Sequence, residues 1–167
     1  DNWNINNDLM QKCMKEIKEA GAQISIYLGG YIVIGAEQKT LNMLLKRLPK
    51  KGNYPFQLPY HAAFHTPLLQ SISKKAKGIF SRDMFLKPQT PIIDGRGYIW
   101  SPWSTNETDL WNYTLGHQVC NPYDFTKSLS VAIKEFSPDK IVLLGPGNTL
   151  GGAIGQIICQ LKWKNIS

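Results

Sequence analysis

Two consecutive glycines, Gly29-Gly30, separate two short apolar segments and limit how the first third of the chain can fold. Apolar residues alternate with others before the pair, over 23–28, and again after it, over 31–35. A period of two is typical of strands, and a two-residue glycine linker between strands indicates a tight hairpin. We therefore expect two antiparallel strands joined at Gly29-Gly30.

Helical patterns flank this hairpin. Apolar residues recur at every third or fourth position over 8–20, where Asn7 or Asp8 would cap the helix, and over 40–48. Residues 54–60 predict a third, extended strand. The order helix, strand, strand, helix, strand is that of a ferredoxin-like lobe without its first strand. We expect 1–60 to form such a lobe, incomplete at its N-terminus.

Residues 61–167 predict a larger mixed α/β part. A helix begins at Thr66-Pro67, and its apolar residues should line the inner side: Leu68, Leu69, Ile72, Ala76, Ile79 and Phe80. Further helices are expected over 107–116, over 124–136 and up to Trp163, with short strands at 91–94 and 98–100. The apolar run over 140–144 predicts a buried strand of the parallel type.

Composition limits the class of protein. Apolar residues make up 43% of the 167, enough for a core, and no apolar run reaches the ~18 residues of a membrane span. The cysteines, Cys13, Cys120 and Cys159, indicate buried reduced thiols rather than a disulfide framework, which suits a reducing compartment. The net charge of +7 is typical of solvated lysine faces, or of a surface that attracts nucleic acid, an acidic carrier protein or coenzyme A phosphates.

His65 is the first candidate for chemistry. It stands just before the helix predicted at Thr66-Pro67, where the positive end of the helix dipole favours an uncharged imidazole, the form that a general base needs. By itself, such a histidine more often packs or caps. His61 and His65 also have a zinc-chelating spacing, but the prolines around them place the pair outside a helix and no other ligand is near, so no metal site is predicted.

Two later segments are also candidates. Gln118 lies in a polar cluster before Asn121-Pro122, which is ordinarily a turn but can place the glutamine to orient a catalytic group. The Gly-rich segment 145–152 follows the strand expected over 140–144. Its glycine spacing does not fit the dinucleotide fingerprint, so it reads as a tight turn or a weak nucleotide site. No serine lies in a Gly-x-Ser-x-Gly elbow, so the chain holds a candidate base without a nucleophile.

These segments, in this order, resemble the malonyl-CoA:acyl carrier protein transacylases and the acyltransferase domains of polyketide synthases. Ala63-Phe64-His65-Thr66-Pro67 is similar to the block around the family's catalytic histidine, and Gln118 with Asn121-Pro122 is similar to its Gln-x-x-Asn-Pro block. Leu144-Gly145-Pro146-Gly147 is similar to its late Gly-Pro-Gly turn. The resemblance implies that 61–167 is the C-terminal part of an α/β-hydrolase-like acyltransferase domain.

The resemblance also implies a function. A serine outside this chain would take a malonyl group from coenzyme A and pass it to the phosphopantetheine thiol of an acyl carrier protein, with His65 as base and the Gln118 carbonyl orienting it. Ala63 and Phe64 would contact the substrate, the phenylalanine favouring malonyl over methylmalonyl groups. The chain would need no cofactor or metal and would act in the cytoplasm, in fatty acid or polyketide synthesis, without nucleic acid or membrane.

The implied partners are therefore malonyl-CoA, the carrier protein and the serine-bearing N-terminal half of the same enzyme. The arginine that pairs with the malonyl carboxylate in the family has no counterpart here, because Arg47, Arg82 and Arg96 read as surface residues. The alternative is a non-catalytic relative that docks an acidic carrier protein. A nucleotide-binding or nucleic-acid-binding module is the third hypothesis, and it would bind with a steep salt dependence.

Overall fold

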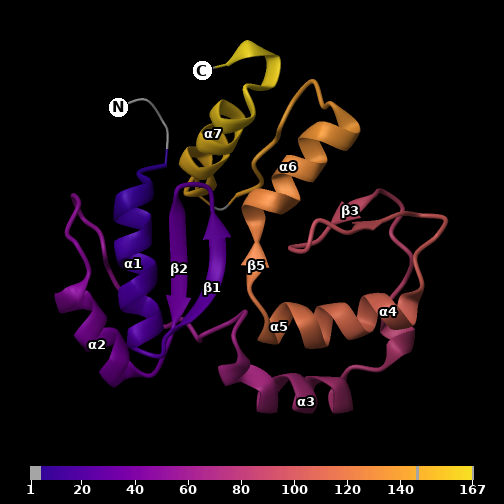
Figure 1. The fold of residues 1–167 in the computed structure, drawn as a ribbon. Helices are drawn as coiled ribbons and strands as arrows, with labels where there is room; N and C mark the ends of the chain where they lie inside the picture. Colours follow the sequence, from indigo (N-terminus) through magenta and orange to yellow (C-terminus); the bar gives the residue numbers. More distant parts are fainter. Residues whose placement is uncertain (1–4, 146, 167) are drawn as a thin grey trace.

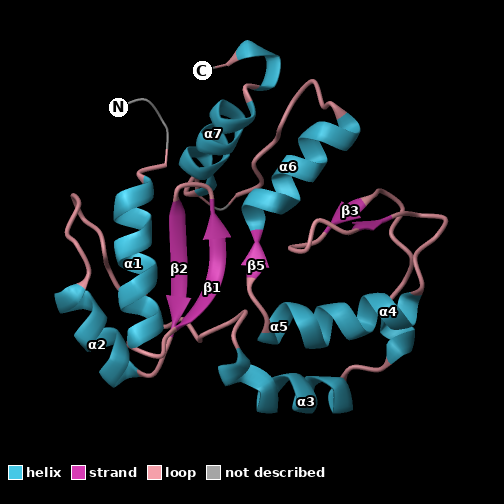
Figure 2. Ribbon diagram, in the orientation of Figure 1, coloured by secondary structure: helices cyan, strands magenta, loops and turns pink. Residues whose placement is uncertain are grey.

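The structure, a computed structural model, describes residues 5–145 and 147–166. Narrow sheets lie among helices (Figures 1 and 2). The helices are α1 (Asn7–Glu19), α2 (Gln38–Arg47), α3 (Gln70–Ile79), α4 (Glu107–Asn112), α5 (Gln118–Cys120), α6 (Phe125–Phe136) and α7 (Leu150–Leu161). The strands are β1 (Gln23–Leu28), β2 (Tyr31–Gly35), β3 (Ile92–Ile93), β4 (Ile99–Trp100) and β5 (Tyr123–Asp124). Short 3₁₀ turns cover Pro67–Leu69, Arg82–Met84 and Trp163–Asn165.

The predicted hairpin is confirmed. β1 and β2 pair antiparallel, with Leu28 opposite Tyr31 across the Gly29-Gly30 turn. The turn is anchored to later helices, because the Gly29 amide donates to Thr126 Oγ1 of α6 at 2.8 Å and the Gly30 amide donates to Gln156 Oε1 of α7 at 2.8 Å. The hairpin tip is therefore tied to α6 and α7 (Figure 1).

A small core lies where α1 and α2 pack against the hairpin. Ile17, Ala22 and Leu44 are its buried centre. Asn6 caps α1 by accepting a hydrogen bond from the Leu9 amide, one residue before the predicted cap at Asn7 or Asp8. α2 ends before Pro49, which cannot donate the next helical hydrogen bond.

The strand expected over 54–60 is wrong. These residues form no strand beyond an isolated bridge between Lys51 and Tyr54, and Pro55 and Pro59 have no amide hydrogen for a ladder. The third strand of the sheet is β5, which pairs parallel to β1 in the order β2-β1-β5. Because β5 lies beyond residue 60, one sheet joins both predicted parts, and the division into 1–60 and 61–167 stays a prediction.

The buried strand expected over 140–144 is also wrong. These residues lie outside strands, and Val142 and Leu144 are 75% and 88% exposed. An apolar run forms a buried strand only where a neighbouring strand supplies hydrogen-bond partners and other elements cover its faces. None of the strands in the described ranges pairs with it.

The predicted inner side of the helix after Thr66 is wrong as well. Leu68, Ile72 and Ile79 are 46%, 50% and 67% exposed, whereas Ser73 of α3 is buried and donates to the Leu115 carbonyl at 2.6 Å. Of the predicted inner residues, Leu69 and Ala76 are partly buried, whereas Leu68, Ile72, Ile79 and Phe80 are exposed. The side of α3 that carries Ser73 packs against the helical segment that follows α4.

A longer helical segment replaces the turn expected around Gln118. α4 continues through a π-helical stretch, Tyr113–His117, into α5, so the helical path runs from Glu107 to Cys120. The short strands predicted at 91–94 and 98–100 are confirmed as the β3–β4 pair. No helix in the described ranges is long and apolar enough to cross a membrane.

Candidate active site around His65

The C-terminal end of α5 presents free carbonyl groups. The helical bonding ends at Asn121, whose amide donates to the His117 carbonyl at 2.9 Å. One residue on, the amide that would bond to Gln118 in a continued helix belongs to Pro122, which has no hydrogen to donate. The main-chain oxygens of Gln118 and Val119 are thus left available for another segment.

His65 donates a hydrogen bond to each of these carbonyl oxygens. Its main-chain amide donates to the Val119 carbonyl at 2.9 Å, and its ring Nδ1 donates to the Gln118 carbonyl at 2.5 Å. Its backbone is left-handed, with φ of 62°. Non-glycine residues seldom adopt this conformation, which costs on the order of 1–3 kcal/mol and is often found at functional sites.

The residues next to His65 are fixed on both sides. The Phe64 carbonyl accepts a hydrogen bond at 2.8 Å from the hydroxyl of Ser25, a buried residue of β1. Thr66 is fully buried, and its hydroxyl donates to the Ala63 carbonyl at 2.6 Å. The backbone before the histidine is therefore bonded to β1 through Ser25, and the residue after it is bonded back to Ala63.

This arrangement determines which ring nitrogen is free. A carbonyl oxygen can only accept, so the hydrogen bond to Gln118 places a proton on Nδ1. In the neutral ring Nε2 then carries the lone pair, and the ring is only partly buried. A histidine oriented in this way can take a proton from a reacting group at Nε2.

His61 is placed differently. It is exposed, and its Nδ1 bonds to the Pro59 carbonyl at 2.7 Å, two residues away. The Nδ1 atoms of His61 and His65 thus bond to carbonyls of different segments. Among residues 5–145 and 147–166, no group of three or more His, Cys, Asp or Glu is placed to hold a metal ion.

The two predicted substrate-binding residues, Ala63 and Phe64, differ in their exposure. Phe64 is 50% exposed, and its ring centroid is 6.4 Å from that of His65. Ala63 is partly buried against the end of β2, where a Cβ added to Gly35 would come within 2.8 Å of the Ala63 methyl. The structure thus leaves Phe64 free to meet a ligand and uses Ala63 for close packing.

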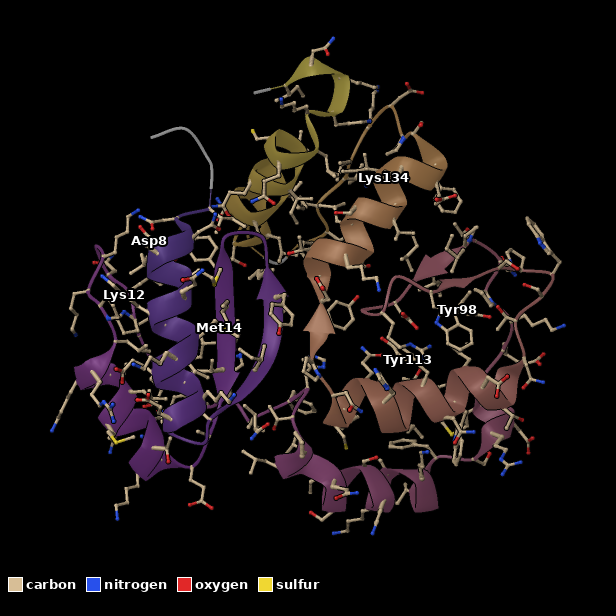
Figure 3. The ribbon with its side chains drawn as sticks, viewed as in Figure 1. Asp8, Lys12, Met14, Tyr98, Tyr113 and Lys134 are labelled. Atoms are coloured by element: carbon tan, nitrogen blue, oxygen red, sulfur yellow. The ribbon has the colours of Figure 1, made fainter. Side chains whose placement is uncertain are left out.

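A buried carboxylate organises the β3–β4 turn. The Asp94 side chain is 2% exposed, and it accepts hydrogen bonds from the Arg96 and Tyr98 amides, the Arg96 guanidinium and the Trp100 indole. Arg96 is therefore not a simple surface residue, because its guanidinium also lies 4.3 Å from the centroid of the Tyr113 ring. Figure 3 shows Tyr98 and Tyr113 between this turn and the helical segment below it.

The other two arginines have partners too. Arg47 forms an ion pair with Glu16 at 2.7 Å, and Arg82 lies over the Trp111 ring at 5.3 Å from its centroid. The first contact joins α2 to α1, and the second joins the turn Arg82–Met84 to α4. Neither arginine is brought to His65 by a contact that the structure records.

Burial changes two pKa values near this turn. It raises the pKa of the Tyr113 hydroxyl to about 12, and the same hydroxyl accepts a hydrogen bond from the Gly95 amide at 3.1 Å. Burial lowers the pKa of His117, and the positive charge of Arg96 lowers it further. The negative charge of Asp94 acts in the opposite direction, and the His117 ring stacks on the Tyr113 ring at 5.7 Å between centroids.

The Gly-rich segment 145–152 lies partly outside the described residues. Pro146 lies outside the described residues, and α7 begins at Leu150, after Thr149. Gly147 has φ of 86°, consistent with a turn. The three cysteines are free and partly exposed rather than buried.

Some contacts around His65 were not predicted from the sequence. Ser25 and Tyr123, whose ring centroid lies 5.4 Å from that of His65, both come from distant segments. A signal for the Gln118 contact was present, since a proline four residues after a helical residue leaves that residue's carbonyl without its usual donor. Ser25 could have been noticed as a polar residue inside an apolar strand.

No protein-family model matches the chain. It is 22% identical over 138 residues to the highly reducing polyketide synthase claI of Penicillium crustosum, covering 75% of this chain and 5% of that protein. It is 25% identical over 167 residues to the highly reducing polyketide synthase cm3B of Cordyceps militaris, covering 93% of this chain and 6% of that protein. The chain therefore spans about one twentieth of the length of these relatives.

A solved structure shares the fold. The crystal structure of MCAT from Streptococcus pneumoniae matches with a TM-score of 0.65 and 22% sequence identity, over 92% of this chain and 49% of that chain. At this identity the likeness concerns the fold alone. In its mixed α/β fold, the chain is similar to about half of that MCAT (malonyl-CoA:acyl carrier protein transacylase) chain.

Proposed function

We propose that this chain carries the histidine half of an acyltransferase site, and that His65 is its general base. The observation that carries the proposal is the hydrogen bond from His65 Nδ1 to the Gln118 carbonyl, which leaves Nε2 free to accept a proton. The acyltransferase-like fold and the low-identity polyketide synthase relatives support the same class of reaction.

The proposed reaction has two transfers. A serine hydroxyl outside this chain attacks the thioester carbonyl of malonyl-CoA, its proton passes to His65 Nε2, and the coenzyme A sulfur leaves with that proton. The phosphopantetheine thiol of an acyl carrier protein then gives its proton to Nε2 and attacks the serine ester. The serine oxygen leaves and recovers the proton, so the enzyme returns to its starting state.

Phe64 is proposed to set the preference for the acyl group. Phe64 is next to His65 in the chain, and its exposed ring has its centroid 6.4 Å from that of His65. The ring can therefore lie beside the malonyl α-carbon. A ring there fills the space that an α-methyl group would need. One methyl group in such a pocket is worth about 1–3 kcal/mol, which makes this a preference rather than a complete block.

The serine is proposed to come from the N-terminal half of the same enzyme, which would cover part of this chain. The chain exposes 11460 Å² of accessible surface, whereas a compact monomer of 18.9 kDa exposes roughly 8,300 Å². The exposed apolar run around Val142 and Leu144 fits this view, because a strand of the covering half could pair with it.

One observation favours the second candidate, a non-catalytic module that docks an acidic carrier protein. Leu68, Ile72 and Ile79 form an exposed apolar strip on and before α3. α3 also carries the exposed Lys74 and Lys75 and no acidic residue. Such a surface fits a partner with apolar and acidic side chains. The docking candidate requires no role for His65 in chemistry, which separates it from the enzyme.

The test uses the full-length protein, radiolabelled malonyl-CoA and a purified acyl carrier protein. His65→Ala should lower malonyl transfer on the order of a thousandfold, because the base is lost from both steps. His61→Ala is the matched control, an exposed histidine four residues away, and it should transfer at the wild-type rate.

Circular dichroism should show the same fold for both variants. A near-normal rate in His65→Ala would show that this histidine is not the base. Absence of transfer by the wild-type protein, together with binding of the carrier protein, would favour the docking candidate.

A further inference from the structure

The ring of His65 has a second support besides Gln118. Tyr123, in β5, lies against it with ring centroids 5.4 Å apart and an angle of 44° between the ring planes. A hydrogen bond at Nδ1 restrains rotation of the imidazole about its Cβ–Cγ bond but tolerates some angular variation. A second ring, tilted and at this distance, narrows that variation.

Tyr123 is itself held by the β3–β4 turn. Its ring lies directly on the backbone of Gly95, where an added Cβ would come within 2.6 Å of the Tyr123 Cδ2 atom. The Asp124 amide donates to the Gly95 carbonyl at 3.1 Å, which fixes the main chain next to Tyr123 on the same turn. Only glycine at position 95 leaves room for the ring.

The turn has a rigid base. Asp94 is buried, and it accepts hydrogen bonds from the Arg96 amide at 2.8 Å, the Tyr98 amide at 3.1 Å and the Trp100 indole at 3.1 Å. The Gly95 amide also donates to the Tyr113 hydroxyl, in the segment that leads to Gln118. The same turn therefore contacts both the aromatic support of His65 and the helical segment that carries its hydrogen-bond acceptor.

We propose that Tyr123 is a positioning residue for His65, with the Asp94-Gly95 turn as its base. The proposal rests on the proposed function in one respect, that His65 is the catalytic base. The hydrogen bond to Gln118 and the ring contact with Tyr123 together direct Nε2 toward the reacting group. A catalytic group must be held within about 10–20° of its productive orientation, and one hydrogen bond does not achieve this.

The test compares two substitutions at one position in the full-length protein. Tyr123→Val removes the ring but keeps a residue suited to a strand, and Tyr123→Phe keeps the ring and serves as the control. The value of kcat for malonyl transfer should fall about tenfold or more in Tyr123→Val, with KM for malonyl-CoA unchanged, because only the orientation of the base is lost. Tyr123→Phe should stay within twofold of the wild type.

A second readout does not depend on the reaction. In protein labelled with ¹⁵N-histidine, the Nδ1 proton of His65 should give a resolved NMR signal, assigned by its absence in His65→Ala. The signal should persist in Tyr123→Phe and broaden or disappear in Tyr123→Val, because a mobile ring exchanges this proton faster. If the wild type transfers no malonyl group, the proposed function fails, while the NMR result alone still decides the positioning proposal.

The proposal is overturned if Tyr123→Val keeps the Nδ1 signal, whatever its rate, or if it loses the signal with an unchanged kcat. Circular dichroism and thermal unfolding establish whether each variant is folded. If Tyr123→Val does not fold, Tyr123→Met fills the same space with a flexible chain and is measured in its place with the same two outcomes.

Discussion

Nδ1 of His65 donates a hydrogen bond to the main-chain oxygen of Gln118 at 2.5 Å, across 53 residues of sequence. The acceptor is free because the helix ends there and the residue that would supply the next amide is Pro122. The free end of one helical segment thus determines which nitrogen of His65 can act.

Gln118→Ala should retain more than about a tenth of the wild-type rate of malonyl transfer. The atom that contacts His65 belongs to the main chain, and alanine keeps it and favours the helix. His65→Ala, measured beside it, should lose far more activity. A loss in Gln118→Ala equal to that in His65→Ala would mean that the glutamine side chain itself takes part.

Phe64→Ser should raise the use of methylmalonyl-CoA relative to malonyl-CoA about tenfold or more, because the smaller side chain leaves space for an α-methyl group. The measurement is the ratio of kcat/KM for the two thioesters. Phe80→Ser, at another exposed phenylalanine, is the control and should leave the ratio unchanged. An unchanged ratio in Phe64→Ser would exclude the proposed contact.

Gly29→Ala should lower the free energy of unfolding by about 1–3 kcal/mol. Gly29 has φ of 62°, and an added Cβ would lie 2.9 Å from the Ala153 carbonyl, a main-chain atom that cannot easily move. Gly30→Ala is the matched comparison, since its added Cβ meets only the flexible Gln156 side chain, and it should cost less. Urea unfolding of both variants measures the difference, and equal costs would contradict the prediction.

Stability should decrease as the pH falls below about 6.5, the ordinary pKa of histidine, with His117 as one cause. Burial and Arg96 lower the pKa of His117 in the folded state, so the unfolded chain binds its proton more readily and gains as the pH falls. The contribution of neutral His117 is therefore present above this pH and lost below it. His117→Gln should show a smaller change in urea midpoint between pH 7.5 and 5.5, and an identical change would contradict the assignment.

Local patterns predicted several elements well. The Gly29-Gly30 hairpin, the helices on both sides of it and the β3–β4 pair depend on contacts between residues near in sequence, and periodicity reports such contacts directly. The expected strands over 54–60 and 140–144 failed because a strand also needs a neighbouring edge. Periodicity carries no information on whether such an edge is present.

The apolar residues of α3 show the same limit in a helix. Their spacing correctly predicts a helix after Thr66, but Leu68, Ile72 and Ile79 face solvent while Ser73 packs inward. A pattern identifies which residues share a face. The packing of other segments determines whether that face is covered.

The sequence by itself determined the hairpin, most of the helices and the candidate residues His65 and Gln118. It did so because turn residues, caps and apolar spacing act over a few positions. Only the tertiary structure decided how His65 is held, since the Gln118 carbonyl, Ser25 and the Tyr123 ring come from segments far from it in the chain. Such contacts exist only after folding brings helix ends and strands together, and no local pattern encodes them.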